Sequence, residues 1–342
     1  MKALHSLLGV ATVLAIMIPL ICHGESTMAP EYEWTKMIEP AAFAPRDGAG
    51  ALVFKNRMWL LGGWNPRDPK HFPKITNNEV WSSANGLEWK LETESAPWEG
   101  RHTAGYVVFK DKMWIVGGDA NRSHYQNDVW SSADGVNWDL VCEEVPWRDR
   151  VLHCTAVFQA KIWVFGGQNM PGFVHEPEDI FYADAWNSED GKNWTKVADD
   201  LPWGPRGMVG KPLVFKNRIW LLGGGTYNTP KNPERIFYND VWSSDDGIHW
   251  EQHLSSAPWA PRQMLDVAAF DNRMWVLEGW GRTEGNLNDV WYSEDGHQWT
   301  EVSGTPWAPR HAGCVFVFEN ALWMVAGNNL TADVWKLTRK RF

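Results

Sequence analysis

The chain has 342 residues and a formal net charge of −10 at pH 7. An acidic surface argues against nucleic acid or an anionic membrane as the main partner. The composition has one strong deviation, 25 tryptophans, and all of them except Trp64 and Trp280 recur at four regular positions of a repeat.

Residues 1–24 have the pattern of a cleaved secretory signal. Lys2 supplies a positive start, an apolar run follows to Ile21, and the small residues Cys22 and Gly24 precede the cleavage site expected before Glu25. No later stretch is apolar enough to cross a membrane. We therefore expect a secreted or periplasmic protein whose residues 25–342 form one domain, without membrane insertion.

The rest of the chain is a sixfold repeat with a period of about 50 residues, which is typical of propeller arrays. The six units begin near Arg46, Arg101, Arg150, Arg206, Arg262 and Arg310. Short runs rich in Val, Trp and Phe, bounded by Gly, Asp, Asn or Pro, predict four antiparallel strands in each unit. In the second unit these strands are expected at Gly105 to Phe109, at Met113 to Val116, in NDVWSS from Asn127, and around Trp138.

The sixth unit has only three strands of its own, the last in ADVWKL from Ala332. Its missing outer strand is expected at Trp34-Thr35-Lys36, which matches Trp194-Thr195-Lys196 of the third unit. The N-terminus would then complete the last sheet, close the ring and hide the strand edges.

The 23 repeated tryptophans are expected to fill the wedges between neighbouring sheets. They form four sets, and where the Pro-Trp set lacks a member, Phe43 precedes the opening arginine of the first unit. The sets are Trp59, Trp114, Trp163, Trp220, Trp275, Trp323; Trp81, Trp130, Trp186, Trp242, Trp291, Trp335; Trp34, Trp89, Trp138, Trp194, Trp250, Trp299; and Trp98, Trp147, Trp203, Trp259, Trp307.

These features resemble the kelch-type β-propellers, the superfamily that includes galactose oxidase. The resemblance rests on the Gly-Gly pair that ends the second strand, the aromatic residue shortly before it, the opening Pro-Arg and the tryptophan of the last strand. It implies an all-β, six-bladed propeller over the whole mature chain. The turn SSADGVNW from Ser131 also resembles the Asp-box of sialidases, but it is one residue shorter, so we interpret it as a turn motif in which Asp134 binds backbone N–H groups. The fold alone does not define a function.

The opening arginines have two interpretations. They either bond carbonyls and carboxylates between blades, or they form a ring of positive charge that holds a carboxylate or sulfate group of a ligand. On the second interpretation, Arg46, Arg101, Arg262 and Arg310 are candidate ligand-binding residues.

Function is expected where equivalent positions of the repeat differ. Trp64 and Trp280 both follow the Gly-Gly position, where the other units have Asp119, Gln168, Gly225 and Asn328. The resemblance places this position on the face formed by the loops that enter strand 1 and leave strand 2. The two indoles either stack on a ligand such as a sugar ring or pack under their own loops.

The fifth unit carries two carboxylates where the other units have small residues. Asp266 lies four residues after Arg262, and Glu278 replaces the first glycine of the pair. Antiparallel counting places Asp266 opposite residue 277 or 278. Two close carboxylates cannot both ionise easily, so one pKa should rise, as general acid–base catalysis requires. The alternative is that they neutralise arginines or lie in channel water.

Polar and titratable residues at the starts of the first strands add to the same face. Asp47, His102, His153, His311 and Asn328 are candidate ligand-binding residues. The three histidines lie at different offsets from their arginines, so we predict no metal site, and no cofactor is expected. Of the cysteines, Cys142, Cys154 and Cys314 cannot all pair, and Cys154 and Cys314 lie in opposite blades, too far apart for a disulfide.

Three functions remain open from the sequence. The first is a module that binds a glycan, a small acidic sugar or a protein ligand. The second is a carbohydrate-active enzyme, such as a sugar mutarotase or epimerase that resembles the sialic-acid mutarotases, or a lyase or hydrolase, with Asp266 and Glu278 as acid and base. The third is an architectural propeller.

Overall fold

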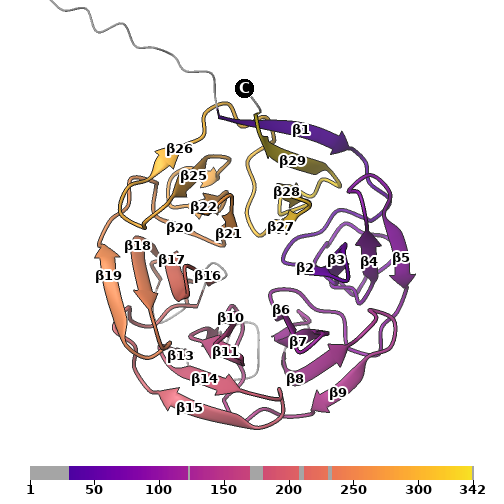
Figure 1. The fold of residues 1–342 in the computed structure, drawn as a ribbon. Coiled ribbons are helices and arrows are strands. Elements are labelled where there is room, and N and C mark those ends of the chain that lie inside the picture. Colours follow the sequence, from indigo (N-terminus) through magenta and orange to yellow (C-terminus); the bar gives the residue numbers. More distant parts are fainter. Residues whose placement is uncertain (1–30, 122–123, 170–179, 208–211, 230–232, 341–342) are drawn as a thin grey trace, which may run out of the picture.

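The computed structural model describes residues 31–121, 124–169, 180–207, 212–229 and 233–340. These residues are all-β, with no helix and therefore none that could span a membrane. Six four-stranded antiparallel sheets stand side by side around a central axis, as Figure 1 shows. The expected signal, residues 1–24, lies outside the described part of the chain.

The first three sheets correspond to the first three repeat units. Sheet 1 contains β2 (Gly50–Phe54), β3 (Arg57–Leu61), β4 (Val80–Ser83) and β5 (Lys90–Thr93). Sheet 2 contains β6 (Gly105–Phe109), β7 (Lys112–Asp119), β8 (Tyr125–Ser132) and β9 (Asp139–Cys142). Sheet 3 contains β10 (Cys154–Phe158), β11 (Lys161–Phe165), β14 (Ala185–Ser188) and β15 (Trp194–Ala198).

The other three sheets follow in the same order. Sheet 4 contains β16 (Leu213–Phe215), β17 (Arg218–Thr226), β18 (Ile236–Ser244) and β19 (Trp250–Leu254). Sheet 5 contains β21 (Asp266–Phe270), β22 (Arg273–Leu277), β25 (Val290–Ser293) and β26 (Thr300–Glu301). Sheet 6 contains β27 (Cys314–Phe318), β28 (Ala321–Val325), β29 (Val334–Arg339) and β1 (Tyr32–Ile38).

Two small sheets lie outside these six. One joins β12 (Gln168–Asn169) to β13 (Ile180–Phe181), and the other joins β20 (Arg262–Gln263), β23 (Trp280–Gly281) and β24 (Gly285–Asn286). In each large sheet the first strand of the unit lies nearest the axis and the last lies at the rim (Figure 1). Residues before and after the first strands therefore line the axis, where the site residues were predicted.

Turn chemistry sets the register of each sheet. The first and second strands of sheet 2 are joined at Lys110 and Asp111, whose φ angles are 47° and 55°, as a two-residue type I′ hairpin requires. In the turn from strand 3 to strand 4, Asp134 Oδ1 accepts the backbone N–H groups of Val136 and Asn137 at 2.9 and 2.7 Å. Asp134 therefore holds this turn as the sequence predicted.

Neighbouring sheets meet through edge-to-face aromatic pairs. In every wedge, the aromatic residue three positions before an opening arginine contacts the last-strand tryptophan of the following sheet. The ring centroids are 4.8 to 6.2 Å apart and the interplanar angles are 80° to 85°. The pairs are Trp98–Trp138, Trp147–Trp194, Trp203–Trp250, Trp259–Trp299, Trp307–Trp34 and Phe43–Trp89. Phe43 thus takes the place of the missing tryptophan. Each such pair contributes about 0.5–1.5 kcal/mol beyond the area that it buries.

A second contact in each wedge involves the inner tryptophans. The indole of Trp59 lies over Gly135 of the next sheet so closely that a Cβ on this glycine would be 2.1 Å from the ring. Trp114, Trp163, Trp220 and Trp323 meet the turn glycine of the following sheet in the same way. Sheet 6 has no such turn, and there Tyr32 of β1 meets Trp275 edge-to-face at 4.8 Å.

The N-terminal strand β1 completes sheet 6. It pairs antiparallel with β29, so that Trp34 faces Leu337 and Lys36 faces Trp335. Tyr32 is buried, and its hydroxyl donates a 2.6 Å hydrogen bond to Asp271 of sheet 5. The predicted pairing of the two chain ends is therefore present.

Deletion of residues 25–38 should destabilise the protein by at least about 3 kcal/mol, since it removes a whole edge strand and a buried aromatic residue that alone contributes about 1.5–3 kcal/mol. Chemical denaturation of the full chain and of the deletion variant measures this difference. Deletion of residues 25–30 alone, which spares β1, is the matched control. Equal stability of all three chains would contradict the closing role of β1.

Candidate functional site

Each of the six large sheets has one buried ion pair that involves its opening arginine. The six opening arginines are at most 3% exposed. Each pairs with a carboxylate of its own sheet at 2.5 to 2.7 Å, and this carboxylate also accepts the Nε1–H of the tryptophan two residues later. The pairs are Arg46–Glu79, Arg101–Asp128, Arg150–Asp184, Arg206–Asp240, Arg262–Asp289 and Arg310–Asp333.

The arginines also donate to the backbone. Arg101, for example, binds the carbonyl oxygens of Glu99 and Gly117 at 3.0 and 2.9 Å. The arginines thus bond carbonyls and carboxylates, as the first of the two interpretations predicted. The carboxylate partners, however, lie in the same sheet and not in a neighbouring one. Arg46, Arg101, Arg262 and Arg310 belong to this framework and do not line the axial cavities, so we leave them out of the candidate site.

Two residues after the opening arginines, the chain forms a narrow collar around the axis. In the described units these residues are Gly48, Thr103, Leu152, Met264 and Ala312, with φ angles of 50° to 59°. Four of the five collar residues are linked directly, since the N–H of Thr103 donates to Gly48, that of Gly48 to Ala312, and that of Ala312 to Met264, at 2.8 to 3.1 Å. The collar separates two axial cavities.

The outer pocket, with a volume of about 220 Å³, lies on one side of the collar and receives residues from all six units. It brings together five predicted site residues: Asp47, Trp64, His102, His311 and Asn328. Sequence reasoning missed its remaining polar and aromatic lining, which includes Thr103, Asp119, Asn121 and Tyr227. Among the described residues no lysine or arginine lines this pocket.

Asp47 and Asn328 are bonded to each other in the lining of the outer pocket. Asn328 Nδ2 donates to Asp47 Oδ2 at 2.6 Å, and the backbone of Asp47 pairs with that of Trp64. Burial raises the pKa of Asp47, against the opposing effects of His102 and Asn328. The Trp64 indole stacks beside His102 at 6.4 Å and 27°, and His102 Nδ1 lies 3.0 Å from the carbonyl oxygen of Asp119.

Trp280 and His311 form a similar aromatic–histidine pair. Trp280 of the fifth unit meets His311 edge-to-face at 5.3 Å, and His311 Nδ1 lies 2.5 Å from Asn286 Oδ1. Burial and the nearby Arg235 lower the pKa of His311 to about 4. Its ring is neutral at pH 7, and if Nδ1 donates to Asn286, Nε2 is a hydrogen-bond acceptor. Trp64 and Trp280 are both half-buried.

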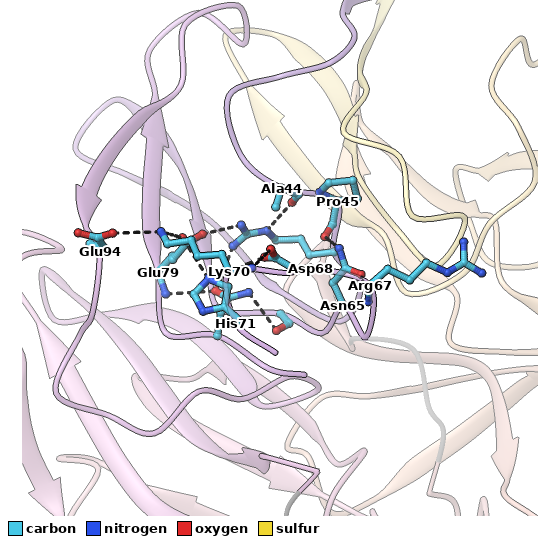
Figure 2. A network of polar contacts seen from close by, with 12 residues as sticks. Ala44, Pro45, Asn65, Arg67, Asp68, Lys70, His71, Glu79 and Glu94 are labelled. Carbon is cyan, nitrogen blue, oxygen red and sulfur yellow. Dashed lines mark hydrogen bonds and ion pairs between the residues drawn. The ribbon is translucent and has the colours of Figure 1, made fainter. Parts of the chain in front are cut away.

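The loop after Trp64 is fixed by Glu79, which replaces the aspartate of the other five units. Its longer side chain binds Arg46 at 2.7 Å and still reaches Lys70 at 2.6 Å and His71 at 3.2 Å. Figure 2 shows Lys70 and His71 turned toward Glu79, whereas Arg67 extends away. Burial opposes ionisation, but Arg46 and Lys70 outweigh it and lower the pKa of Glu79 to about 2.

Glu79→Asp should free this loop without unfolding the sheet, because aspartate serves the equivalent arginine in every other unit. We expect an unchanged melting temperature and roughly tenfold faster amide hydrogen exchange within residues 65–75, about 1.4 kcal/mol of lost local protection. Asp128→Glu, the reverse exchange in sheet 2, is the control and should leave residues 65–75 unaffected. Unchanged exchange in Glu79→Asp would show that the loop is held by other contacts.

The inner chamber lies on the other side of the collar and has a volume of about 100 Å³. Asp266 and His153 line it, together with Tyr106, Thr155 and Cys154. Asp266 is directly opposite Leu277 in the β21–β22 pair, which is one of the two predicted registers.

Glu278 and Asp266 are buried neighbours that share a side-chain hydrogen bond. Burial, followed by the charge of Asp266, raises the pKa of Glu278 well above its ordinary value, while the N–H of Gly313 donates to Glu278 Oε1 at 2.7 Å. The predicted pair of close carboxylates is present, and burial together with the nearby Asp266 carboxyl favours the protonated form of Glu278.

Glu278 also has an unusual backbone. Its φ of 49° is left-handed, and four of the equivalent positions are glycines: Gly62, Gly117, Gly166 and Gly223. A non-glycine residue there costs about 1–2 kcal/mol. Glu278 lowers the stability of the fold in three ways, because its carboxyl group is buried, lies beside another carboxyl group and is attached to a strained backbone. Such a destabilising residue marks this position as a candidate functional site.

His153 points into the inner chamber and is 8% exposed. Neither ring nitrogen has a hydrogen bond of good geometry, although the carbonyl of Val116 lies near enough to influence the ring. Burial and Arg150 lower its pKa from 6.5 to about 4. His153 is therefore neutral at pH 7 and separated by the collar from His102 and His311.

The described residues contain no group of three or more His, Cys, Asp or Glu side chains placed to hold a metal ion. The three predicted histidines do not converge, since two line the outer pocket and the third lines the inner chamber. No disulfide joins Cys142, Cys154 and Cys314.

The low pKa of His153 makes stability depend on pH. Between pH 6.5 and 4, His153 is protonated in the unfolded chain but stays neutral in the folded protein. The free energy of unfolding therefore falls as the pH drops, by about 3 kcal/mol at pH 4. Urea denaturation at pH 7 and pH 4.5 should show a clearly smaller difference in His153→Gln than in the wild type. His249→Gln, at an exposed histidine, is the control. An equal pH dependence in all three chains would contradict this assignment.

Comparison of the chain with protein-family models gives no match, and comparison with curated proteins gives none either. The site is therefore interpreted from its own geometry.

Proposed function

We propose that the chain is a secreted or periplasmic six-bladed β-propeller of the kelch type. Support comes from the six four-stranded sheets, from the Gly-Gly pairs in the left-handed region at the end of second strands, and from closure of the last sheet by the N-terminal strand. The apolar run before residue 24 supports export.

We further propose that the protein binds a hydroxyl-rich glycan in the outer pocket. The observation that carries this proposal is the convergence of Trp64, His102, Asp47, Asn328 and His311 on one axial cavity. An indole face binds the apolar face of a sugar ring, and carboxylate, amide and neutral imidazole groups serve its hydroxyls as acceptors and donors. The rigid ring keeps these groups in place, so that little entropy is lost on binding.

The charges of the outer pocket favour a neutral sugar over an acidic one. Asp47 and Asp119 line the pocket, and among the described lining residues no guanidinium or ammonium group is present to hold a carboxylate. The arginines that were candidates for this task are buried in ion pairs. Of the ligands expected from the sequence, a neutral or basic glycan therefore fits the pocket better than an acidic sugar.

Trp64→Ala should reduce glycan affinity about tenfold or more, because loss of a stacked aromatic contact costs about 1–2 kcal/mol. A ligand found on a glycan array would be titrated calorimetrically against the wild type and the variant. Phe72→Ala is the control, since Phe72 is 70% exposed, belongs to the same loop and lies outside the outer pocket. If no glycan binds, or if the two variants bind equally well, the proposal fails.

The Asp266–Glu278 pair favours a second candidate function, a carbohydrate-active enzyme such as a sugar mutarotase or epimerase. The raised pKa of Glu278 suits this residue as an acid, and the neighbouring Asp266, which lines the inner chamber as Glu278 does not, is the candidate base. In mutarotation the acid protonates the ring oxygen while the base removes the anomeric hydroxyl proton, so that the bond between the anomeric carbon and the ring oxygen breaks and leaves an aldehyde and a free hydroxyl. After rotation of the aldehyde, that hydroxyl adds to its opposite face and gives its proton back to the first carboxylate, while the second carboxyl group returns a proton to the aldehyde oxygen.

Glu278→Gln separates the two candidate functions. An enzyme would lose anomer exchange, measured by NMR on a reducing sugar, whereas a binding protein would keep its glycan affinity. The variant should also be more stable than the wild type at pH 8, because the folded wild type must hold a proton that the unfolded chain releases above about pH 4.5. This gain should vanish at pH 4. Equal stability of the two chains at both pH values would contradict the raised pKa of Glu278.

A further inference from the structure

The hairpin of β17 and β18 brings an arginine to the wall of the outer pocket. Its last cross-strand pair is Thr226 opposite Ile236, so Tyr227 and Arg235 follow at the end of the paired segment. The Arg235 guanidinium stacks over the Tyr227 ring, 4.0 Å from the ring centroid, and Arg235 Nε donates to Asn228 Oδ1 at 3.0 Å. Because Tyr227 lines the outer pocket, Arg235 stands directly beside that pocket.

A second arginine joins it from the fifth unit. Arg282 directly follows β23, and its Nη2 donates to the backbone oxygen of Arg235 at 2.9 Å. The Arg282 guanidinium lies 5.2 Å from the ring centroid of Phe237. Strand β23 begins with Trp280, which contacts His311 of the outer pocket. Two guanidinium groups from neighbouring units therefore lie against the same stretch of chain, and each is held by an aromatic ring.

Neither of these two guanidinium groups is neutralised by the protein. Within the described ranges, Arg235 and Arg282 donate to an amide oxygen and to a backbone carbonyl, and neither forms an ion pair with a carboxylate. Their sequence neighbours Glu234 and Glu284 are no exception. Arg282 is exposed and Arg235 is half-buried. Since each guanidinium has five N–H donors, both keep donors that a ligand can use.

The charge of Arg235 acts on the outer pocket, since it contributes with burial to the lowered pKa of His311. The pocket lining itself contains Asp47 and Asp119 and suits an uncharged sugar ring, whereas the two adjoining arginines suit an anion. A planar guanidinium binds a carboxylate or sulfate through two parallel hydrogen bonds. Stacking on an aromatic ring restricts the arginine in advance, so that less entropy is lost when the anion binds.

We propose that Arg235 and Arg282 form an anion subsite beside the outer pocket and that this subsite binds a sulfate or carboxylate group. The anion is either a substituent of the bound glycan, in which case the inference rests on the proposed function, or a free anion. In the first case the ligand is a glycan that places an uncharged ring against Trp64 and an anionic group outside the pocket, on that ring or on the next.

A glycan array that carries each oligosaccharide in neutral, sulfated and sialylated form tests the subsite, followed by calorimetric titration of the best-bound set. We expect an anionic form to bind about tenfold more tightly than its neutral counterpart at low ionic strength, and less so at high salt. Arg235→Gln/Arg282→Gln should lose this preference and keep the affinity for the neutral form. Lys112→Gln/Lys161→Gln, which removes the same charge outside the outer pocket, should keep the preference.

Titration with sodium sulfate, followed through the Nε–H NMR signals of Arg235 and Arg282, tests the subsite without a glycan. We expect both signals to shift with sulfate but not with sodium chloride at the same ionic strength. Arg282→Gln, a change at an exposed side chain, covers the case in which the double variant does not fold, and it should weaken sulfate binding several-fold.

The outcomes separate this inference from the proposed function. Equal binding of neutral and anionic glycans, together with no response to sulfate, overturns the subsite and leaves the glycan proposal standing. A preference for anionic glycans that survives in the double variant also overturns the subsite. A response to sulfate that depends on Arg282, in the absence of any glycan binding, supports the subsite and refutes the glycan proposal.

Discussion

The edge-to-face aromatic pair between neighbouring sheets is the interaction on which this structure depends. Backbone hydrogen bonds hold each sheet together, but the main contacts that fill the wedge between two large sheets are between side chains, and six wedges must have the same width for a ring to close. The repeated pairs, from Trp98–Trp138 to Phe43–Trp89, have nearly the same angle. Each wedge is thus filled by the same shape, which explains why tryptophan recurs so regularly.

Because contacts in the wedges stabilise the fold, residues beside the axis can vary and serve a functional site. The wedges and the buried Arg–carboxylate pairs hold the sheets from outside, so residues beside the axis do not have to support the fold. They differ from unit to unit: the collar alone contains Gly48, Thr103, Leu152, Met264 and Ala312. The same scaffold can therefore place an indole, two carboxylates and a neutral imidazole at different heights along one axis without loss of stability elsewhere.

Much of the framework was predictable because its residues recur. The strands, the closing strand at Trp34, the place of Phe43 and the contact of Asp266 with Glu278 all follow from spacing and antiparallel counting. The collar was not predictable, since left-handed backbone at positions that carry Thr, Leu, Met or Ala leaves no pattern of side chains. The different spacings of the histidines from their arginines were visible in the sequence. Only the structure shows that a histidine one residue after the arginine lines the outer pocket, whereas one three residues after it lines the inner chamber. Glu79, where every other unit has Asp, was a visible signal that sequence reasoning missed.

The closing pair of β1 and β29 has a consequence for biosynthesis. Residues 32–38 emerge from the ribosome long before their partners at 334–339. Sheets 1 to 5 can each form from local hairpins while translation continues, but the sixth must wait until residues 334–339 have been made. During that interval an edge strand at each end of the unfinished arc remains exposed. This is the stage at which the nascent protein is most vulnerable to aggregation and most in need of a chaperone.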